Sequence, residues 1–208
     1  MASLEQNILN ALQAHVELEQ AAPQLIGVPN LVSSLSFFGM RGAKVLHLNR
    51  ILPVIARYGP DVLLVDIGSN DLAQGAQPAR VAASVEQWVK EATRVFPGVI
   101  CLLSVVPRAT ALGNMTPEQF LNSALELEAL LKLLPKSHDN VLYHKHKGFY
   151  EREEDQGVKS PLIPYAWSHD GIHPNNQLGR KKYKNSLRLA IAKCYKHLQS
   201  QKTPLNSQ

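Results

Sequence analysis

The stretch Asp61–Leu72, "DVLLVDIGSNDL", decides the fold, because it joins a buried strand directly to a polar turn. Residues 62–67 are apolar nearly throughout, which is typical of a strand in a parallel sheet with both faces covered. Gly68 ends this strand, and the turn that follows contains the residue types that turns prefer. Since open α/β sheets bind their ligands beyond the carboxyl ends of the strands, residues 68–71 form a candidate site. The alternative is a polar turn without a chemical role.

Strands and helices alternate along the rest of the chain, which indicates an α/β fold with a mainly parallel sheet. Thr116 followed by Pro117 marks the start of one helix especially clearly. The segment 147–167 is expected to be a loop. Further strands are predicted at 31–38, 98–107 and 140–146, and helices at 3–20, 78–96, 116–135, 176–200 and in a segment ending near 58–60.

The composition is that of a globular domain. Of 208 residues, 45% are hydrophobic and 19% charged, and a chain of this length can bury a substantial core. We expect a single domain over residues 1–202 and a disordered tail at 203–208. No run of residues approaches the roughly 18 apolar residues of a membrane span, and the first residues do not resemble a signal peptide. Cys101 and Cys194 show no spacing pattern, so we expect free thiols and a cytoplasmic or nuclear location.

A second motif, Ser168–Asn175 "SHDGIHPN", carries an aspartate and a histidine three positions apart. In a turn of this length the carboxylate of Asp170 can bind one ring nitrogen of His173, and the other nitrogen can then act as a general base. Gly171 permits the tight path, and Asn175 or the asparagine after it can cap the final helix. The alternative is an Asx-type turn with a surface histidine.

Together these motifs resemble blocks of a known hydrolase family. "GSND" at 68–71 is similar to the G-x-N-D block, and "DGIHPN" at 170–175 to the D-x-x-H block, of the SGNH, or GDSL-type, hydrolases. "FFGMRGAKV" at 37–45 resembles the family's glycine block. The similarity runs from about residue 37 to residue 190. It is greatest to small esterase domains encoded by animal genomes and LINE-type retrotransposons.

The resemblance implies a flavodoxin-like, three-layer α/β/α sandwich that hydrolyses an acetyl or acyl ester of a small molecule such as a lipid or a sugar. It implies that His173 is the general base and Asp170 its partner. It also implies that Asn70 and the backbone amide of Gly42 donate hydrogen bonds to the oxyanion. No metal and no organic cofactor are expected.

The nucleophile of the family lies in a G-D-S block, which this sequence lacks. Ser3, at the start of the first predicted helix, is the candidate nucleophile, and a plain N-cap is its alternative role. The strand that precedes the nucleophile in the family is missing here. We therefore expect four parallel strands, including the one at 31–38, where the family has five.

Two other functions remain open. One is a catalytically inactive module that binds nucleic acid or a protein partner on the same scaffold, because residues 180–202 contain eight Lys or Arg and no acidic residue. A basic stripe of this kind attracts phosphate groups, although it is also found on ordinary solvated helices. The other is a shortened gene product without a function of its own.

Overall fold

The computed structural model describes residues 35, 39, 42–110, 115–147, 149, 151–152, 159–160, 167–175 and 178–202. The chain divides into two units, Met1–Arg41 and Gly42–Gln208, and the fold described below is that of the second. The predicted helix at 3–20, with Ser3, and the predicted tail at 203–208 lie outside the described residues, as does nearly all of the predicted strand at 31–38.

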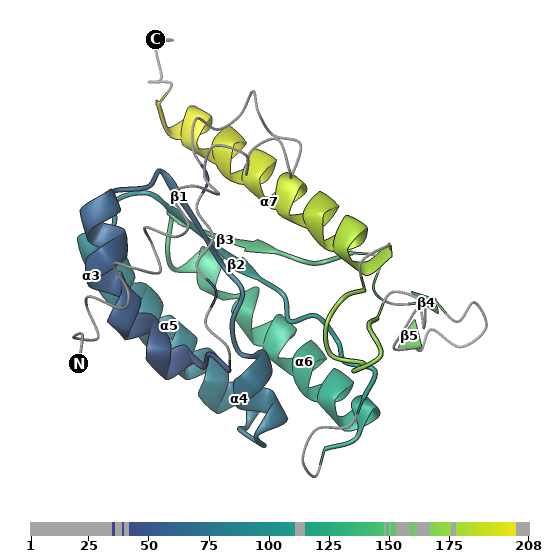
Figure 1. The fold of residues 1–208 in the computed structure, drawn as a ribbon. Coiled ribbons are helices and arrows are strands. Elements are labelled where there is room, and N and C mark those ends of the chain that lie inside the picture. The colour runs from purple at the N-terminus through teal and green to yellow at the C-terminus, as the bar shows by residue number, and fades with distance from the viewer. Residues whose placement is uncertain are drawn as a thin grey trace, which may run out of the picture. The chain divides into compact units, whose positions relative to one another are not determined.

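The centre of the unit is a parallel sheet of three strands in the order β1-β2-β3 (Figure 1). The strands are β1 (Val62–Val65), β2 (Val99–Leu103) and β3 (Val141–His144). They lie within three of the four predicted strand segments, and both pairings are parallel. The mainly parallel α/β sheet predicted from the sequence is thus confirmed.

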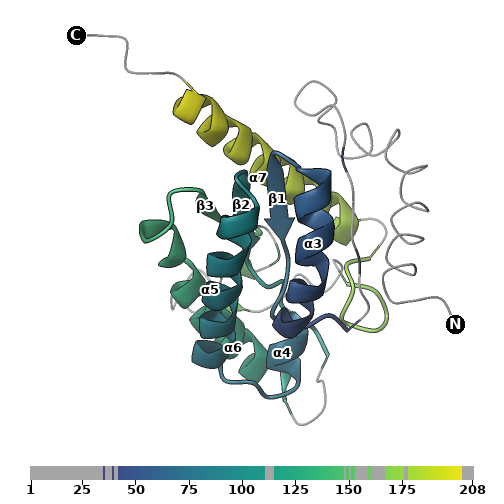
Figure 2. The ribbon, with the colours of Figure 1, turned by 90° about the vertical axis from the view of Figure 1, so that its left-hand side faces the viewer.

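The fully buried strand β2 sends alternate side chains into two apolar layers, as the period of two in a strand requires. Ile100 and Leu102 pack in one core cluster with residues of α3, α5 and α6. Cys101 and Leu103 pack in another, against the helix α7. Figures 1 and 2 show α7 on one face of the sheet and the other long helices on the opposite face. The helices are α3 (Leu48–Tyr58), α4 (Ser69–Ala73), α5 (Pro78–Val95), α6 (Pro117–Leu131) and α7 (Leu178–Lys202), with 3-10 turns η1 (Val45–His47) and η2 (Leu134–Lys136).

The helix α6 begins where the sequence predicts, because its first turn satisfies its own backbone donors. The Thr116 hydroxyl accepts a hydrogen bond from the Gln119 backbone N–H at 3.2 Å, and the Gln119 side chain accepts one from the Thr116 N–H at 2.8 Å. This reciprocal pair is a capping box. Pro117 follows at the first helical position, where no N–H is needed.

Two short strands, β4 (Glu151–Arg152) and β5 (Lys159–Ser160), form an antiparallel pair within the segment expected to be a loop. The expectation of a loop there was wrong for these four positions, which lack the apolar alternation that marks a strand. Cys101 and Cys194 are free thiols, as predicted, and both are buried. None of the helices in the described ranges combines the length and the apolar character that a bilayer span requires.

Candidate active site

The turn after β1 depends on a glycine at its first position. Gly68 has a φ of +99°, which side chains disfavour. A Cβ atom there would also lie 3.1 Å from Cδ2 of Leu127, on α6. Glycine thus lets the chain turn tightly against the core and begin α4 at once. The helix α4 then presents Ser69, Asn70 and Asp71 at the carboxyl edge of the sheet.

Two of these side chains hold the segment from Gly42 to Val45 against α4. The Asn70 Nδ2 donates to the Ala43 carbonyl at 2.9 Å, and the Val45 N–H donates to Asp71 Oδ2 at 3.2 Å. Burial raises the pKa of Asp71, although this hydrogen bond opposes the shift. The candidate donor Asn70 therefore contacts the residue next to the other candidate donor, Gly42. The N–H of Gly42 has no acceptor among the described residues.

Arg108 belongs to this group of residues and was missed in the sequence. Its Nε and Nη2 donate to Ser69 Oγ at 3.1 and 2.6 Å, and Nη2 also donates to Asn70 Oδ1 at 3.1 Å. The side chain is only 7% exposed, and its guanidinium lies 5.1 Å from the centre of the Phe120 ring. A single arginine after a fully apolar strand, at the edge where ligands bind, was the signal that could have identified it.

Asp170 and His173 form a hydrogen-bonded pair. The distance between Asp170 Oδ2 and His173 Nδ1 is 2.7 Å. The other carboxylate oxygen accepts the N–H groups of Ile172 and His173 at 2.9 and 3.0 Å. The hydrogen bond from the His173 ring, together with these two, holds the pKa of Asp170 below its usual range. Because an ionised carboxylate only accepts, Nδ1 carries a proton, so in the neutral form of the ring Nε2 presents the lone pair.

The turn that carries this pair is closed by backbone hydrogen bonds. Trp167 and Pro174 form an isolated antiparallel bridge. Within it the Ser168 N–H donates to the His173 carbonyl at 2.8 Å, and the Gly171 N–H donates to the Ser168 carbonyl at 2.9 Å. The side chain of His173 is nevertheless 75% exposed, so its Nε2 is accessible to a ligand.

This turn is also fastened to the loop after β2. The Ala109 N–H donates to the Gly171 carbonyl at 2.7 Å. Gly171 has a φ of +64°, and a Cβ atom there would lie 1.9 Å from the Thr110 hydroxyl oxygen. Because Arg108 immediately precedes Ala109, one loop contacts both Asn70 and the Asp170–His173 turn. Of the predicted site residues, Gly42, Asp170 and His173 lie on loops and Asn70 lies in α4. Hydrogen bonds connect Asn70 to the Gly42–Val45 segment and, through the loop of Arg108 and Ala109, to the Asp170–His173 turn. Ser3 is outside the described residues.

The pair is joined directly to the final helix. Asn175 Oδ1 accepts the N–H groups of Leu178 and Gly179 at 2.9 and 3.0 Å. It therefore satisfies two of the donors that the first turn of α7 leaves open. The sequence predicted a cap from this position or the next, and the structure selects Asn175.

A second polar cluster, not predicted, lies between the sheet and α7. The Ser186 hydroxyl contacts His144 Nε2 at 2.9 Å and His146 Nδ1 at 2.8 Å. Burial lowers the pKa of both histidines to about 4, with charge repulsion between them adding to the shift of His144. Both rings are therefore neutral near pH 7. His146 is 1% exposed.

Asp66 and Tyr183 extend this cluster toward the end of β1. The Tyr183 hydroxyl donates to Asp66 Oδ2 at 2.5 Å, and the same oxygen lies 3.9 Å from His146 Nε2. Desolvation by the surrounding atoms raises the pKa of Asp66, although 34% of its side chain still contacts solvent. No group of three metal-ligating side chains occurs within the part of the chain that the structure describes.

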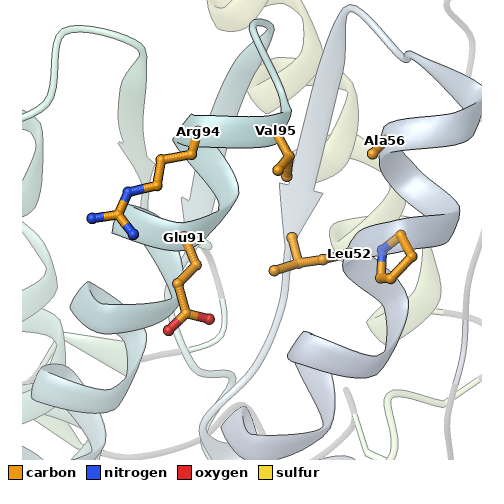
Figure 3. Close-up of a pocket in the computed structure, with 6 residues that line it drawn as sticks. Leu52, Ala56, Glu91, Arg94 and Val95 are labelled. Carbon is orange, nitrogen blue, oxygen red and sulfur yellow. The ribbon is translucent and has the colours of Figure 1, made fainter.

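The hollow shown in Figure 3 belongs to a different part of the molecule. It measures about 460 Å³ and opens between α3 and α5. These helices end at Tyr58 and Val95, just before β1 and β2 begin. The hollow therefore lies toward the amino end of the sheet, away from the Asp170–His173 pair. It is lined by Leu52, Pro53, Ala56, Glu91, Arg94 and Val95.

Comparisons with known proteins bear on the family and on the fold. The sequence profile of the GDSL-like lipase/acylhydrolase family matches residues 15–179. A crystal structure from Bacteroides fragilis, assigned as an acylhydrolase, matches with a TM-score of 0.57 and 18% identity over 74% of this chain and 72% of that one. A GDSL-like lipase from Bacteroides thetaiotaomicron matches with a TM-score of 0.55 and 18% identity, over 73% and 72%. At these identities the solved structures establish the fold alone. No curated protein sequence shows significant similarity to this one.

Proposed function

Because this chain belongs to the GDSL-like lipase/acylhydrolase family, we propose that it is a serine hydrolase of small-molecule carboxylic esters. The observation that carries the proposal is the 2.7 Å contact between Asp170 and His173, with His173 Nε2 left accessible. An aspartate on one ring nitrogen fixes the tautomer in which the other nitrogen accepts a proton. This geometry supports His173 as the base that an acyl-transfer reaction needs.

In the proposed reaction, Ser3 is the nucleophile and His173 the general base. His173 Nε2 takes the hydroxyl proton as the serine oxygen bonds to the ester carbonyl carbon, and the carbonyl electron pair moves to its oxygen. When this intermediate collapses, the alcohol leaves with the proton from His173. Water, activated by the same nitrogen, then releases the acid and restores the serine. Asp170 stabilises the imidazolium that forms in both steps.

Asn70 and Gly42 are proposed to bind the oxyanion. The oxygen of the tetrahedral intermediate carries a full negative charge, and fixed N–H donors stabilise it more than they stabilise the neutral ester. Asn70 Nδ2 has two hydrogens, and one of them donates to Ala43. Neither the second hydrogen nor the Gly42 N–H has an acceptor among the described residues. An acetyl or acyl ester of a lipid or a sugar is the proposed substrate class.

The decisive experiment is labelling of the folded protein with a fluorophosphonate probe, followed by peptide mapping by mass spectrometry. Such probes bond to an activated serine. We expect an adduct on Ser3 that is lost in His173→Ala. The matched control is His169→Ala, which removes an exposed histidine from the same turn and should label normally. An absence of any serine adduct in folded protein, or equal labelling of His173→Ala, would contradict the proposal.

A second candidate function rests on the surface of α7. Six of its basic side chains are exposed, at Arg180, Lys181, Lys184, Arg188, Lys193 and Lys196. The helix contains no acidic residue, and among the described residues none of its basic side chains forms an ion pair with an acid. A row of cations without counter-ions fits the phosphate backbone of a nucleic acid. This binding would need neither Ser3 nor the Asp170–His173 pair.

Binding of a labelled single-stranded RNA, measured by fluorescence anisotropy, tests this second function. Each released counter-ion steepens the salt dependence, so affinity should fall by at least tenfold between about 50 and 200 mM salt. The double variant Lys181→Glu/Arg188→Glu should lose binding. The control Arg57→Glu/Arg80→Glu makes the same charge change on α3 and α5, across the sheet, and should retain it. An affinity that does not depend on the salt concentration, or an equal loss of binding in both double variants, would exclude this function.

A further inference from the structure

The side-chain amide of Asn70 is held in one orientation by groups of opposite hydrogen-bonding character. An arginine side chain can only donate, so the atom that faces Arg108 Nη2 at 3.1 Å must be the amide oxygen. On the other side, the Ala43 carbonyl can only accept, and it lies 2.9 Å from the amide nitrogen. A rotated amide would place N–H against N–H and oxygen against oxygen. The nitrogen of Asn70 therefore faces the Gly42–Ala43 segment.

The charge that fixes this orientation is unusual, because no carboxylate among the described residues contacts it. Among the described residues, the partners of the Arg108 guanidinium are Ser69 Oγ, Asn70 Oδ1 and the face of the Phe120 ring. Burial lowers the pKa of Arg108, yet a guanidinium stays protonated in proteins. Burying a cation without an anion costs stability. A net positive charge is thus kept beside the amide proposed to meet an oxyanion.

We propose that Arg108 is the positioning residue of the oxyanion site, which it serves by locking and polarising the amide of Asn70. This inference rests on the proposed hydrolase function. A charged donor on Oδ1 withdraws electron density from the amide and strengthens the donor at Nδ2, since hydrogen bonds in series polarise one another in a low-dielectric site. Arg108 itself does not bind the substrate in this scheme.

The same loop gives Arg108 a fixed place relative to the general base. Ala109, the next residue, donates its N–H to the Gly171 carbonyl at 2.7 Å, within the turn that carries Asp170 and His173. The stack of Arg108 on Phe120 anchors the loop from its other side. The position of the guanidinium is therefore tied both to the oxyanion donor and to the catalytic pair.

A double-mutant cycle tests the inference through activity. Removing one oxyanion donor lowers kcat by about 10²- to 10³-fold, and this loss is expected for Asn70→Ala. Arg108→Met should lower kcat by at least about tenfold with KM nearly unchanged, because the effect arises only in the transition state. The kcat of Arg108→Lys, which keeps the charge, should lie between those of Arg108→Met and the unchanged protein. If Arg108 acts through Asn70, the double variant Asn70→Ala/Arg108→Met is no slower than Asn70→Ala alone. Losses that multiply in the double variant would overturn the inference.

A second measurement does not depend on hydrolytic activity. It therefore distinguishes a failure of the Arg108 inference from a failure of the proposed hydrolase function. In ¹⁵N–¹H spectra the Asn70 side-chain amide is identified by its disappearance in Asn70→Ala. Arg108→Met should shift this resonance and accelerate its hydrogen exchange. The amide of Asn140, which donates to the Gly98 carbonyl at 3.2 Å near the start of β2, is the internal control and should not change. If the protein hydrolyses no ester, the hydrolase proposal fails, but this spectrum still tests whether Arg108 fixes the side-chain amide of Asn70. An Asn70 resonance that stays in place in folded Arg108→Met would overturn the inference.

Discussion

Asp170 Oδ2 lies 2.7 Å from His173 Nδ1, while three-quarters of the His173 side chain remains in contact with solvent. The carboxylate binds the ring and two backbone N–H groups of its own turn at the same time. The two interpretations of "SHDGIHPN", an Asx-type turn and a hydrogen-bonded pair, thus describe one arrangement. Its rigidity comes from the turn, and its accessibility comes from the exposed imidazole.

Asp170→Asn is predicted to abolish most of the proposed esterase activity and to leave the fold intact. The asparagine oxygen can still accept the backbone N–H groups, but its amide favours the wrong tautomer of His173. By analogy with dissected serine proteases, kcat should fall by about 10³- to 10⁴-fold. Hydrolysis of p-nitrophenyl acetate and the melting temperature measure the two properties. Asp139→Asn, at an exposed aspartate elsewhere, is the control, and a loss below tenfold in Asp170→Asn would contradict the assigned role.

Acidification is predicted to destabilise the fold through the histidines between the sheet and α7. Their pKa values are about 4 in the folded protein against an ordinary 6.5, so the unfolded chain binds protons more readily. The contribution of these neutral histidines to the stability of the fold is complete above pH 6.5 and is lost as the pH falls toward 4. For His146, which is nearly fully buried, the shift corresponds to about 3 kcal/mol.

Urea unfolding at a series of pH values measures this loss. The raised pKa of Asp66 acts in the opposite direction, because the folded protein takes up that proton first. The variant His146→Gln removes one titrating group and should flatten the slope between pH 6.5 and 4. His169→Gln, at an exposed position, should retain the slope of the unchanged protein. Equal slopes for all three proteins would refute the assignment to His146.

Gly171→Ala is predicted to be strongly destabilising. The new methyl group would lie 1.9 Å from the Thr110 hydroxyl oxygen, 2.8 Å from Thr110 Cβ and 3.0 Å from Thr110 N, so the backbone of one loop must move. Gly59→Ala is the matched control, since Gly59 also has a positive φ but nothing lies near its Cβ position. The control should lose only about 1–2 kcal/mol from backbone strain, and Gly171→Ala clearly more. Thermal unfolding compares them, and similar losses would show that the two loops are not tightly packed.

Thr116→Ala is predicted to cost about 1 kcal/mol, because it removes the side chain that caps α6. Thr93→Ala is the control. Thr93 lies inside α5, where its hydroxyl bonds back to the Lys90 carbonyl, and alanine has the higher helix propensity. Measured by chemical denaturation, the two substitutions should therefore change the free energy of unfolding by different amounts or in opposite directions. A Thr93→Ala loss as large as that of Thr116→Ala would mean that the cap contributes little.

The parts of the molecule that the sequence predicts well are those whose cause is local. The apolar run before Gly68 predicts β1, and Thr116 with Pro117 predicts the start of α6. The pairing of Asp170 with His173 follows from a spacing of three. Each of these depends on interactions over a few residues, which a single sequence displays directly.

What the sequence does not display are contacts between distant segments. Arg108 meets Ser69 and Asn70 nearly forty positions earlier. Its place after an apolar strand marks it as a candidate, but no local pattern predicts these partners. His146 and Ser186 meet in the same way, at a separation of 40. The first contact exists because parallel strands bring their carboxyl ends together, and the second because α7 packs against the end of β3. Both require the arrangement of the whole sheet and its helices.

The Asn175 cap has a consequence for the lifetime of the Asp170–His173 pair, which is proposed to be catalytic. His173 stands two residues before the side chain that holds the first turn of α7, and the ends of helices are where native-state opening begins. Fraying of that turn would release the imidazole before the core between α7 and β2 is disturbed. The amide protons of Leu178 and Gly179 thus report, through their exchange with deuterium, the fraction of time in which the proposed base, His173, is in position. Inactivation would then precede global unfolding, because opening of the first turn of α7 needs less free energy than the unfolding that the melting curve measures.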